Sequence, residues 1–171
     1  KTGLFVNQII DKYLNTKNIA VLSGPSFAID VVMKKPIGLT LATKSEVTKE
    51  IVKKAFKNDY VKLRHTEDVV GTEICGAIKN VIALAAGMLE GLGASNSTRA
   101  MLLTESLHDI EEMIDVFGGN RRTVLSFAGF GDLLLTCTST TSRNYSYGKM
   151  IGERKSLDVL KKYTDKITVE G

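Results

Sequence analysis

The pattern of apolar and polar positions is dominated by one long apolar run, from Val70 to Gly93. Between Val81 and Leu89 no side chain carries a polar group. The run predicts a helix of about six turns, which at about 1.5 Å per residue is over 30 Å long. Each glycine within it costs about 1 kcal/mol of helix propensity, so the glycines indicate a neighbouring element that packs closely against the helix.

Two polar residues, Lys79 and Asn80, interrupt this helix in its middle. An ammonium group left unpaired in a protein core is strongly destabilising, so we expect Lys79 to face a cleft, to pair with a carboxylate, or both. Two interpretations stay open. The structural one is a lysine whose stem lies along the edge of the core while its ammonium reaches water. The functional one is an ammonium that donates a proton and stabilises a developing alkoxide.

Outside this run the pattern divides the chain into two parts. It predicts helices over 5–14 and 45–56 and strands over 19–22, 37–42 and 60–64, a mixture typical of α/β domains. Beyond residue 68 no strand pattern is convincing. Helices are predicted there over 98–117, 131–136, 142–151 and 157–163, with 121–130 as a connection. We therefore expect an α/β part, residues 1–67, followed by an all-α part, residues 68–171.

Composition narrows the class of protein. Of the 171 residues 43% are apolar and 25% are charged, which is typical of a soluble globular protein. The net charge of +4 suits an anionic small ligand, but it is not the concentrated basic surface of a nucleic-acid binder, so no nucleic-acid partner is expected. Cys75 and Cys137 are too few for a disulfide scaffold or a metal site, so we expect two buried thiols, no metal and a cytoplasmic location.

The ends of the chain and its apolar run bear on targeting. The first residues lack the apolar run of a signal peptide, so we expect none there. Glu73, Lys79 and Glu90 interrupt the apolar run, so we expect no membrane span. The chain does not begin with Met and has no obvious end signal, so we expect a fragment of a longer protein.

Three polar segments stand out from plain surface. Ser23-Gly24-Pro25-Ser26-Phe27-Ala28 follows a predicted strand, where small residues let backbone N–H groups approach a ligand, although such a run is often a simple turn. Asp132 lies between glycines and a helix, as a functional carboxylate or as an N-cap. Ser142-Arg143-Asn144 offers a guanidinium fork and neutral donors that suit a phosphate, or a solvated surface. His65 and His108 are isolated, and we expect both to be structural or on the surface.

These residues together resemble a known family. The segments that carry the resemblance are Val-Leu-Ser-Gly-Pro-Ser-Phe-Ala at 21–28, Ala-Ile-Lys-Asn-Val at 77–81, Ala-Gly-Phe-Gly-Asp-Leu at 128–133, Thr-Cys-Thr-Ser at 136–139 and Ser-Arg-Asn at 142–144. In this order and spacing they resemble the bacterial NAD(P)-dependent glycerol-3-phosphate dehydrogenases. The resemblance covers essentially the whole chain. It implies the C-terminal part of a dinucleotide-binding Rossmann domain over 1–67 and a truncated all-α substrate-binding domain over 68–171, similar to the C-terminal domain of 6-phosphogluconate dehydrogenase.

The resemblance also implies an activity. This activity is the interconversion of sn-glycerol 3-phosphate and dihydroxyacetone phosphate with NAD or NADP, which feeds glycerophospholipid synthesis. The resemblance is also compatible with a homodimer. The main dinucleotide fingerprint, G-x-G-x-x-G, is absent from this chain, which implies an incomplete and inactive piece.

Individual site residues follow from the resemblance as well. It implies Lys79 as the catalytic acid and base, which also contacts the substrate, and Asp132 as the carboxylate that holds Lys79. The other residues implied to bind substrate are Gly24, Ser26, Asp132, Thr136, Ser142, Arg143 and Asn144. The residues implied to contact the cofactor are Ala28, Arg143 and Glu170.

The chain departs from the family pattern in three places, at Thr104-Glu105-Ser106-Leu107, at Ser126-Phe127-Ala128-Gly129 and at Ala94–Ser97. Glu105 replaces the usual Arg, so contacts of that Arg cannot be transferred. Two alternatives stay open: another β-hydroxyacid-type dehydrogenase, or a non-catalytic helical module that binds a phosphometabolite or dimerises. A G-x-G-x-x-G fingerprint upstream of Lys1 would favour an enzyme.

Overall fold

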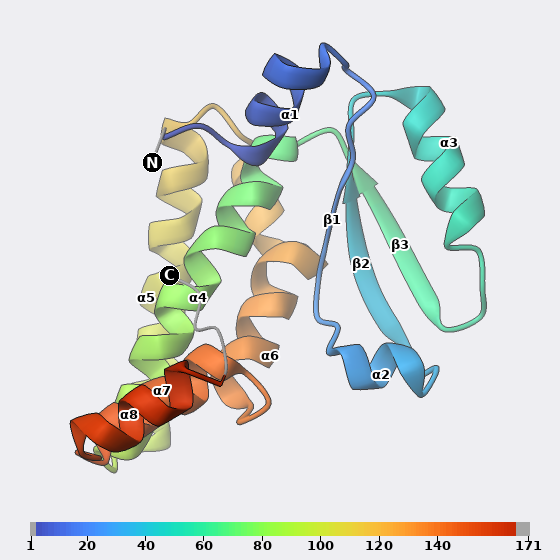
Figure 1. Cartoon of the computed structure of the whole chain (residues 1–171). Coiled ribbons are helices and arrows are strands. Elements are labelled where there is room, and N and C mark those ends of the chain that lie inside the picture. The colour runs from blue at the N-terminus through green and yellow to red at the C-terminus, as the bar shows by residue number, and fades with distance from the viewer. Residues whose placement is uncertain (1–2, 167–171) are drawn as a thin grey trace.

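The computed structural model describes residues 3–166. The α/β part contains a three-stranded sheet in the order β1 (Val21–Ser23), β2 (Ile37–Ala42) and β3 (Val61–Thr66). Strands β1 and β2 are antiparallel, with Val21 opposite Ala42, whereas β2 and β3 are parallel, with Ile37 opposite Val61. Helix α3 (Glu46–Ala55) connects the parallel pair and lies on the side of the sheet away from the helical part (Figure 1). The predicted strands and helices of this part are therefore confirmed to within two residues at most ends.

Two further helices complete the α/β part. Helix α1 (Val6–Leu14) precedes the sheet, as predicted. Helix α2 (Ala28–Val32) follows β1, and the sequence pattern did not predict it. It has only five residues, and two of them, Val31 and Val32, are β-branched, so neither periodicity nor propensity distinguishes it from a loop.

The helical part is built around α4 (Val69–Gly91), the predicted long helix. Helices α5 (Asn96–Val116), α6 (Asp132–Thr138) and α7 (Arg143–Gly152) pack against it, and α8 (Leu157–Thr164) follows (Figure 1). The shared core consists of apolar side chains from α4, α5, α6 and α7 and from residues just before α6, among them Ile74, Ile82, Ala86, Ile110, Ile114, Val124, Leu133 and Tyr145. Within the described residues every strand lies before residue 68 and only helices follow it.

Residues 121–130 differ from the prediction. Instead of an irregular connection they form a 3₁₀ helix, Arg121–Leu125, and a π-helix, Phe127–Gly131, that leads directly into α6. Glycine and aromatic residues give this segment little helix propensity of its own. Tertiary contacts impose the turns: the backbone N–H of Ala128 donates to Thr40 Oγ1 (3.1 Å), and Gly129 lies against the carbonyl of Val124.

Asp68 fixes the start of α4. Its carboxylate accepts hydrogen bonds from the backbone N–H groups of Gly71 and Asn120, both at 2.9 Å, and from Thr123 Oγ1 at 2.6 Å. One carboxylate thus caps α4 and ties it to the segment that follows α5. At the other end Gly93, with φ of +76°, adopts the left-handed conformation that stops a helix.

Glycines bring α4 and α7 into direct backbone contact. A Cβ added at Gly87 would lie 2.0 Å from the Tyr145 carbonyl oxygen, and one at Gly148 would lie 2.0 Å from the Leu84 carbonyl oxygen. One turn further along, Gly91 and Gly152 show the same relation, with closest approaches of 2.2 Å. The expectation that the glycines of the long helix admit a close neighbour is confirmed at this interface.

By length and composition α4 could cross a membrane, a property that core helices of globular proteins share. Nine of its residues are buried, and α5, α6 and α7 all contact it. This arrangement fits a core helix, and the absence of a membrane span stays a prediction.

Candidate active site

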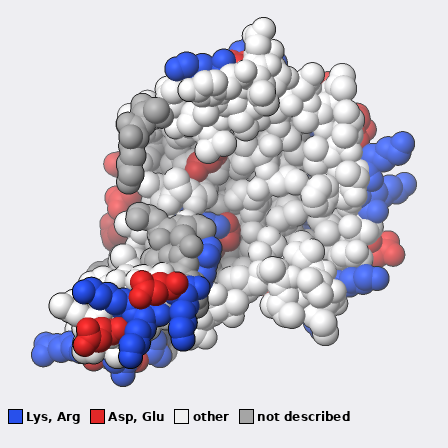
Figure 2. Space-filling view, in the orientation of Figure 1, with Lys and Arg blue, Asp and Glu red and all other residues white. Residues whose placement is uncertain are grey.

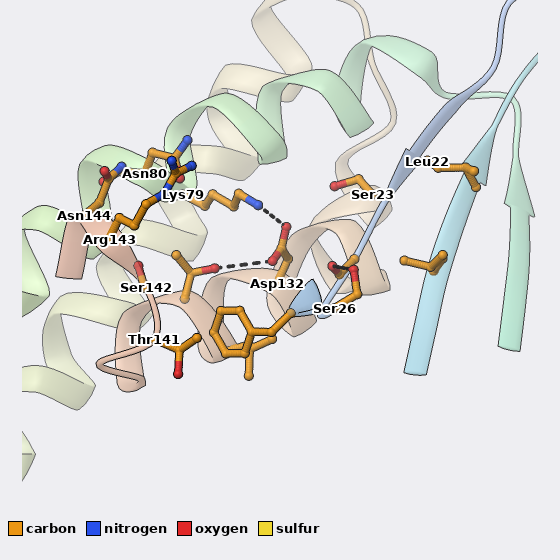
Figure 3. Close-up of a pocket in the computed structure, with 15 residues that line it drawn as sticks. Leu22, Ser23, Ser26, Lys79, Asn80, Asp132, Thr141, Ser142, Arg143 and Asn144 are labelled. Atoms are coloured by element: carbon orange, nitrogen blue, oxygen red, sulfur yellow. Dashed lines mark hydrogen bonds and ion pairs between the residues drawn. The ribbon is translucent and has the colours of Figure 1, made fainter. Parts of the chain in front are cut away.

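Lys79 and Asp132 form an ion pair between α4 and α6 (Figure 3). The Asp132 side chain is 6% exposed and the Lys79 side chain 23%. Thr136, one turn after Asp132 on α6, donates from Oγ1 to the other carboxylate oxygen, Oδ1, at 3.3 Å. Both carboxylate oxygens of Asp132 therefore have a partner. Thr136 holds the Asp132 carboxylate in place, and this carboxylate in turn holds the Lys79 ammonium. The expected carboxylate partner of Lys79 is present.

The ion pair lies on the wall of a cavity of about 350 Å³ between the sheet and the helical part. This volume is at the small end of the range of about 300–1,000 Å³ for small-molecule sites. The turn after β1 forms one wall, and α4, α6 and the start of α7 form the others (Figure 3). The expectation that Lys79 faces a cleft is met, so the Lys79 side chain combines both of the predicted solutions.

Most of the predicted site residues meet at this cavity. The predicted residues that line it are Gly24, Ser26, Lys79, Asp132, Thr136, Ser142, Arg143 and Asn144. Ala28 does not line it; it is the first residue of α2, next to the lining residue Phe27. Glu170 lies outside the described residues.

Ser142 and Asn144 hold the start of α7 in place. Ser142 is the N-cap, and its Oγ accepts a hydrogen bond from the Tyr145 N–H at 3.3 Å. Asn144 donates from Nδ2 to the carbonyl oxygen of Asn80, the residue after Lys79, at 3.2 Å. Both side chains are buried. The two residues therefore have structural contacts as well as a place on the cavity wall, and they set where Arg143 stands relative to Lys79.

The charge of the lining residues is positive. Two cations, Lys79 and Arg143, face one carboxylate, Asp132. The N-terminus of α7 adds partial positive charge because its first N–H groups have no partner within the helix. Lys and Arg side chains also gather over α7 and α8 (Figure 2). The cavity thus suits an anionic small molecule with an oxygen that Lys79 can reach.

The sequence patterns did not assign several lining residues, namely Leu22, Ser23, Phe27, Leu39, Asn80, Leu135 and Thr141. Leu22, Ser23 and Phe27 lie within the segment 21–28 that was singled out, although no role was given to them, and Thr141 directly precedes Ser142. Nothing in the sequence distinguishes Leu39 and Leu135 from ordinary core residues.

The cysteines and one histidine are structural, as expected. Cys75 and Cys137 are buried, and burial raises the pKa of each thiol to about 12. His65 Nε2 lies 2.9 Å from the carbonyl oxygen of Thr43, so its ring links β3 to the residue after β2. His108 is exposed on α5.

Two family models match this chain. Residues 1–49 match the N-terminus of the NAD-dependent glycerol-3-phosphate dehydrogenases, and residues 68–171 match their C-terminus. Named relatives include glycerol-3-phosphate dehydrogenase [NAD(P)+] of Staphylococcus saprophyticus, 42% identical over 90% of this chain and 47% of the relative. The protein of that name from Lactobacillus acidophilus is 43% identical over 90% of this chain and 45% of the relative. The chain spans about half the length of the curated relatives it matches.

Solved structures agree with the fold. A crystal structure of glycerol-3-phosphate dehydrogenase from Coxiella burnetii matches with a TM-score of 0.80 and 34% identity, over 84% of this chain and 44% of that one. The Dunaliella salina protein DsGPDH matches with a TM-score of 0.86 over 98% of this chain and 29% of that one. At 21% identity this second likeness concerns the fold alone. The expected fold, part of a Rossmann domain followed by an all-α domain, is confirmed.

Proposed function

The chain belongs to the NAD-dependent glycerol-3-phosphate dehydrogenase family, and we propose that the complete protein interconverts sn-glycerol 3-phosphate and dihydroxyacetone phosphate with NAD or NADP. We also propose that residues 1–67 belong to its dinucleotide-binding domain and residues 68–171 to its substrate domain. A cytoplasmic role in supplying glycerophospholipid synthesis is part of the proposal. A homodimer stays a prediction that the described contacts do not address.

One observation carries the proposal: Lys79 is held by the buried carboxylate of Asp132 on a cavity wall that also carries Arg143. Reduction of a carbonyl needs a proton donor at the oxygen and positive charge to stabilise the developing alkoxide. Capture of a phosphate needs a second cation, because one ammonium cannot serve both ends of the substrate. The cavity supplies two cations, from α4 and from α7, and its net positive charge fits an anionic substrate.

The proposed chemistry of Lys79 is proton transfer. In the reducing direction the ammonium donates a proton from Nζ to the carbonyl oxygen as that oxygen becomes a hydroxyl, and in the oxidising direction the neutral amine takes the hydroxyl proton back. Asp132 orients Lys79 by accepting a hydrogen bond from Nζ, while Thr136 orients Asp132 through the 3.3 Å hydrogen bond. When bound, the nicotinamide cofactor supplies or accepts the hydride.

The phosphate end of the substrate is assigned to the start of α7. A helix N-terminus with an arginine at its first position provides backbone N–H groups and a bidentate cation for a phosphate. Arg143 has this position, with Ser142 and Asn144 on either side of it. Gly24 and Ser26 are proposed to contact the substrate from the opposite wall.

The residues of this chain suit only part of a dinucleotide. The cavity has room for a triose phosphate and an adjoining ring, and its donors, Arg143 and the serine hydroxyls, suit polar groups. We propose that Ala28, Arg143 and Glu170 contact the cofactor. Most of the dinucleotide surface is then expected from parts of the complete protein outside residues 3–166.

The test is an assay of the complete protein with dihydroxyacetone phosphate and either NADH or NADPH. Lys79→Ala should lower kcat by about 10²–10⁴-fold, the usual contribution of a general acid. Lys149→Ala is the matched control, because Lys149 lies on α7 and pairs with Glu90 at 3.6 Å, outside the cavity lining. We expect it to change kcat less than twofold. Since Lys79→Ala leaves Asp132 buried without its cation, circular dichroism must verify the fold, and added small amines should restore part of the rate.

Three outcomes decide against parts of the proposal. Near-normal turnover of folded Lys79→Ala would remove Lys79 as the acid. Binding of glycerol 3-phosphate without turnover by the wild type would favour the non-catalytic module. Turnover of another β-hydroxyacid in preference to dihydroxyacetone phosphate would change the substrate.

A further inference from the structure

The segment that leads into Asp132 joins the sheet to the helical part. The π-helix Phe127–Gly131 ends one residue before Asp132, so the backbone of this segment determines where the carboxylate stands. Short π-helical turns are uncommon and occur often beside functional sites. This turn contacts the sheet at its first residues and the turn after β1 at its last residue.

At its first residue, the ring of Phe127 is wedged across the sheet. A Cβ added at Gly38 on β2 would lie 2.6 Å from Phe127 Cε1, so the ring occupies the space that a side chain there would take. The Arg64 guanidinium on β3 lies 5.5 Å from the ring centroid, within the range of a cation–π contact. A Cβ at Gly24, just after β1, would lie 3.3 Å from the Phe127 Cβ. Phe127 therefore contacts residues of β2 and β3 and the residue that follows β1.

Two further contacts fix the same segment. The N–H of Ala128 donates to Thr40 Oγ1, and both residues are buried. Gly131 lies against the turn after β1, since a Cβ there would be 3.2 Å from Pro25 Cδ. These contacts hold the turn that carries Gly24 and Ser26 against Gly131, the residue before Asp132. Phe127 is the largest side chain among the residues that make them.

Phe127 is not among the described residues that line the cavity, so it acts on the site through Asp132. We propose that Phe127 is a positioning residue whose ring, wedged against Gly38 and Arg64, sets the place at which Asp132 meets Lys79. Displacing the ring from the sheet shifts Asp132 away from the Lys79 ammonium. Substrate capture by α7 is left intact, because α7 is held by its separate contacts with α4. The part of the inference that is tested by turnover rests on the proposed function.

The test changes the sizes of the side chains at positions 38 and 127, which compete for the same space. Gly38→Ala places a methyl group where the ring lies and should lower turnover per competent site at least tenfold. Phe127→Leu, combined with Gly38→Ala, removes the clash and should restore turnover to within threefold of the wild type. Phe130→Leu is the matched control, because Phe130 lies on the same π-helix but is 44% exposed. Combined with Gly38→Ala, it should restore nothing.

Competent sites are counted by stoichiometric titration of the complete protein with the reduced dinucleotide. A purely structural role would lower the number of sites and leave the turnover of each unchanged, whereas a positioning role lowers turnover at an unchanged number of sites. Unchanged turnover per site in Gly38→Ala, or failure of Phe127→Leu to restore it, would overturn the proposal.

A second readout needs no enzymatic activity. Acylation of lysine requires the reagent to reach Nζ, so a carboxylate that holds Nζ against α6 slows it. Mass spectrometry should show Lys79 acylated several times faster in Gly38→Ala and in Phe127→Ala than in the wild type, relative to Lys53 on α3. If the wild type has no turnover, the proposed function fails, but the labelling still decides on Phe127. Equal Lys79 labelling in all folded variants would reject the positioning role.

Discussion

The contact between α4 and α7 allows a sharp test, because the same substitution should have opposite effects at two glycines of one helix. At Gly87 an added Cβ would lie 2.0 Å from the Tyr145 carbonyl oxygen and 2.8 Å from the Lys149 nitrogen. At Gly76, eleven positions earlier on α4, its nearest neighbour would be Ser23 Oγ at 3.9 Å, an ordinary contact. We predict that Gly87→Ala destabilises the protein and that Gly76→Ala stabilises it.

The magnitudes follow from the geometry. Ordinary contact begins near 3.4 Å, so Gly87→Ala requires the two helix backbones to part by about 1.4 Å. Both obstructing atoms are backbone, so no side chain can swing away to make room. Overpacking of a tight core costs about 1–3 kcal/mol or more, and replacing glycine by alanine within a helix returns about 1 kcal/mol. The expected balance is a net loss of up to about 2 kcal/mol at Gly87 and a gain of about 0.5–1 kcal/mol at Gly76.

The assay is urea unfolding followed by circular dichroism, with the free energy of unfolding taken from each midpoint and slope. The two alanine variants should differ by about 1–3 kcal/mol, the overpacking cost at Gly87, because both gain the same helix propensity. The reasoning is refuted if Gly87→Ala is as stable as Gly76→Ala, since propensity alone would then describe both positions. Gly148→Ala, on the opposite side of the interface, should be destabilised as Gly87→Ala is, because its Cβ also meets a carbonyl at 2.0 Å.

Three further predictions concern single side chains. Asp68→Ala removes the cap of α4 and two other hydrogen bonds, so urea unfolding should show a loss of about 2–4 kcal/mol. Cys75 and Cys137, with pKa values raised to about 12 by burial, should not react with a thiol reagent at pH 8 until the protein is unfolded in denaturant. Burial raises the pKa of Glu73, so its folded state holds the proton more tightly than its unfolded state and stability is lost as the pH rises above the unfolded value near 4.5. Glu73→Gln should therefore stabilise the protein at neutral pH, and the difference from the wild type should vanish at acid pH in unfolding experiments at several pH values.

The sequence predicts the elements whose local pattern and tertiary environment agree. The long apolar run becomes α4, and Ser45 caps α3 through a hydrogen bond to the Thr48 N–H, because periodicity, capping and packing all favour the helix at these places. The turns over 121–131 could not be predicted, since their conformation depends on Thr40, which is 88 residues away from Ala128. Long-range contacts of this kind override local propensity and leave no local signal.

The candidate site is predictable for a different reason. Lys79 is a charged residue within an apolar run. A buried charge is costly unless it is paired, so the sequence indicates a partner or a cleft elsewhere in the fold. The pairing with Asp132, 53 residues later, follows from no local rule, and the resemblance to a family supplied it. Neither the sequence pattern nor the family resemblance predicted that Asn144 has two roles. It lines the cavity, and its amide donates a hydrogen bond to the Asn80 carbonyl.

The contacts of α4 explain why Lys79 and Arg143 can serve one ligand. Asn144 bonds to the backbone beside Lys79, and two pairs of glycines hold the remainder of α7 against the same helix. These contacts fix the backbone positions from which the two cationic side chains extend. An ammonium has three N–H donors, so Lys79 can keep Asp132 on one of them and offer another to a substrate oxygen. In the proposed function Lys79 is the proton donor and Arg143 binds the phosphate, so a fixed spacing between their backbones favours one length of substrate. We expect this selection by length to be lost if the glycine interface is forced apart.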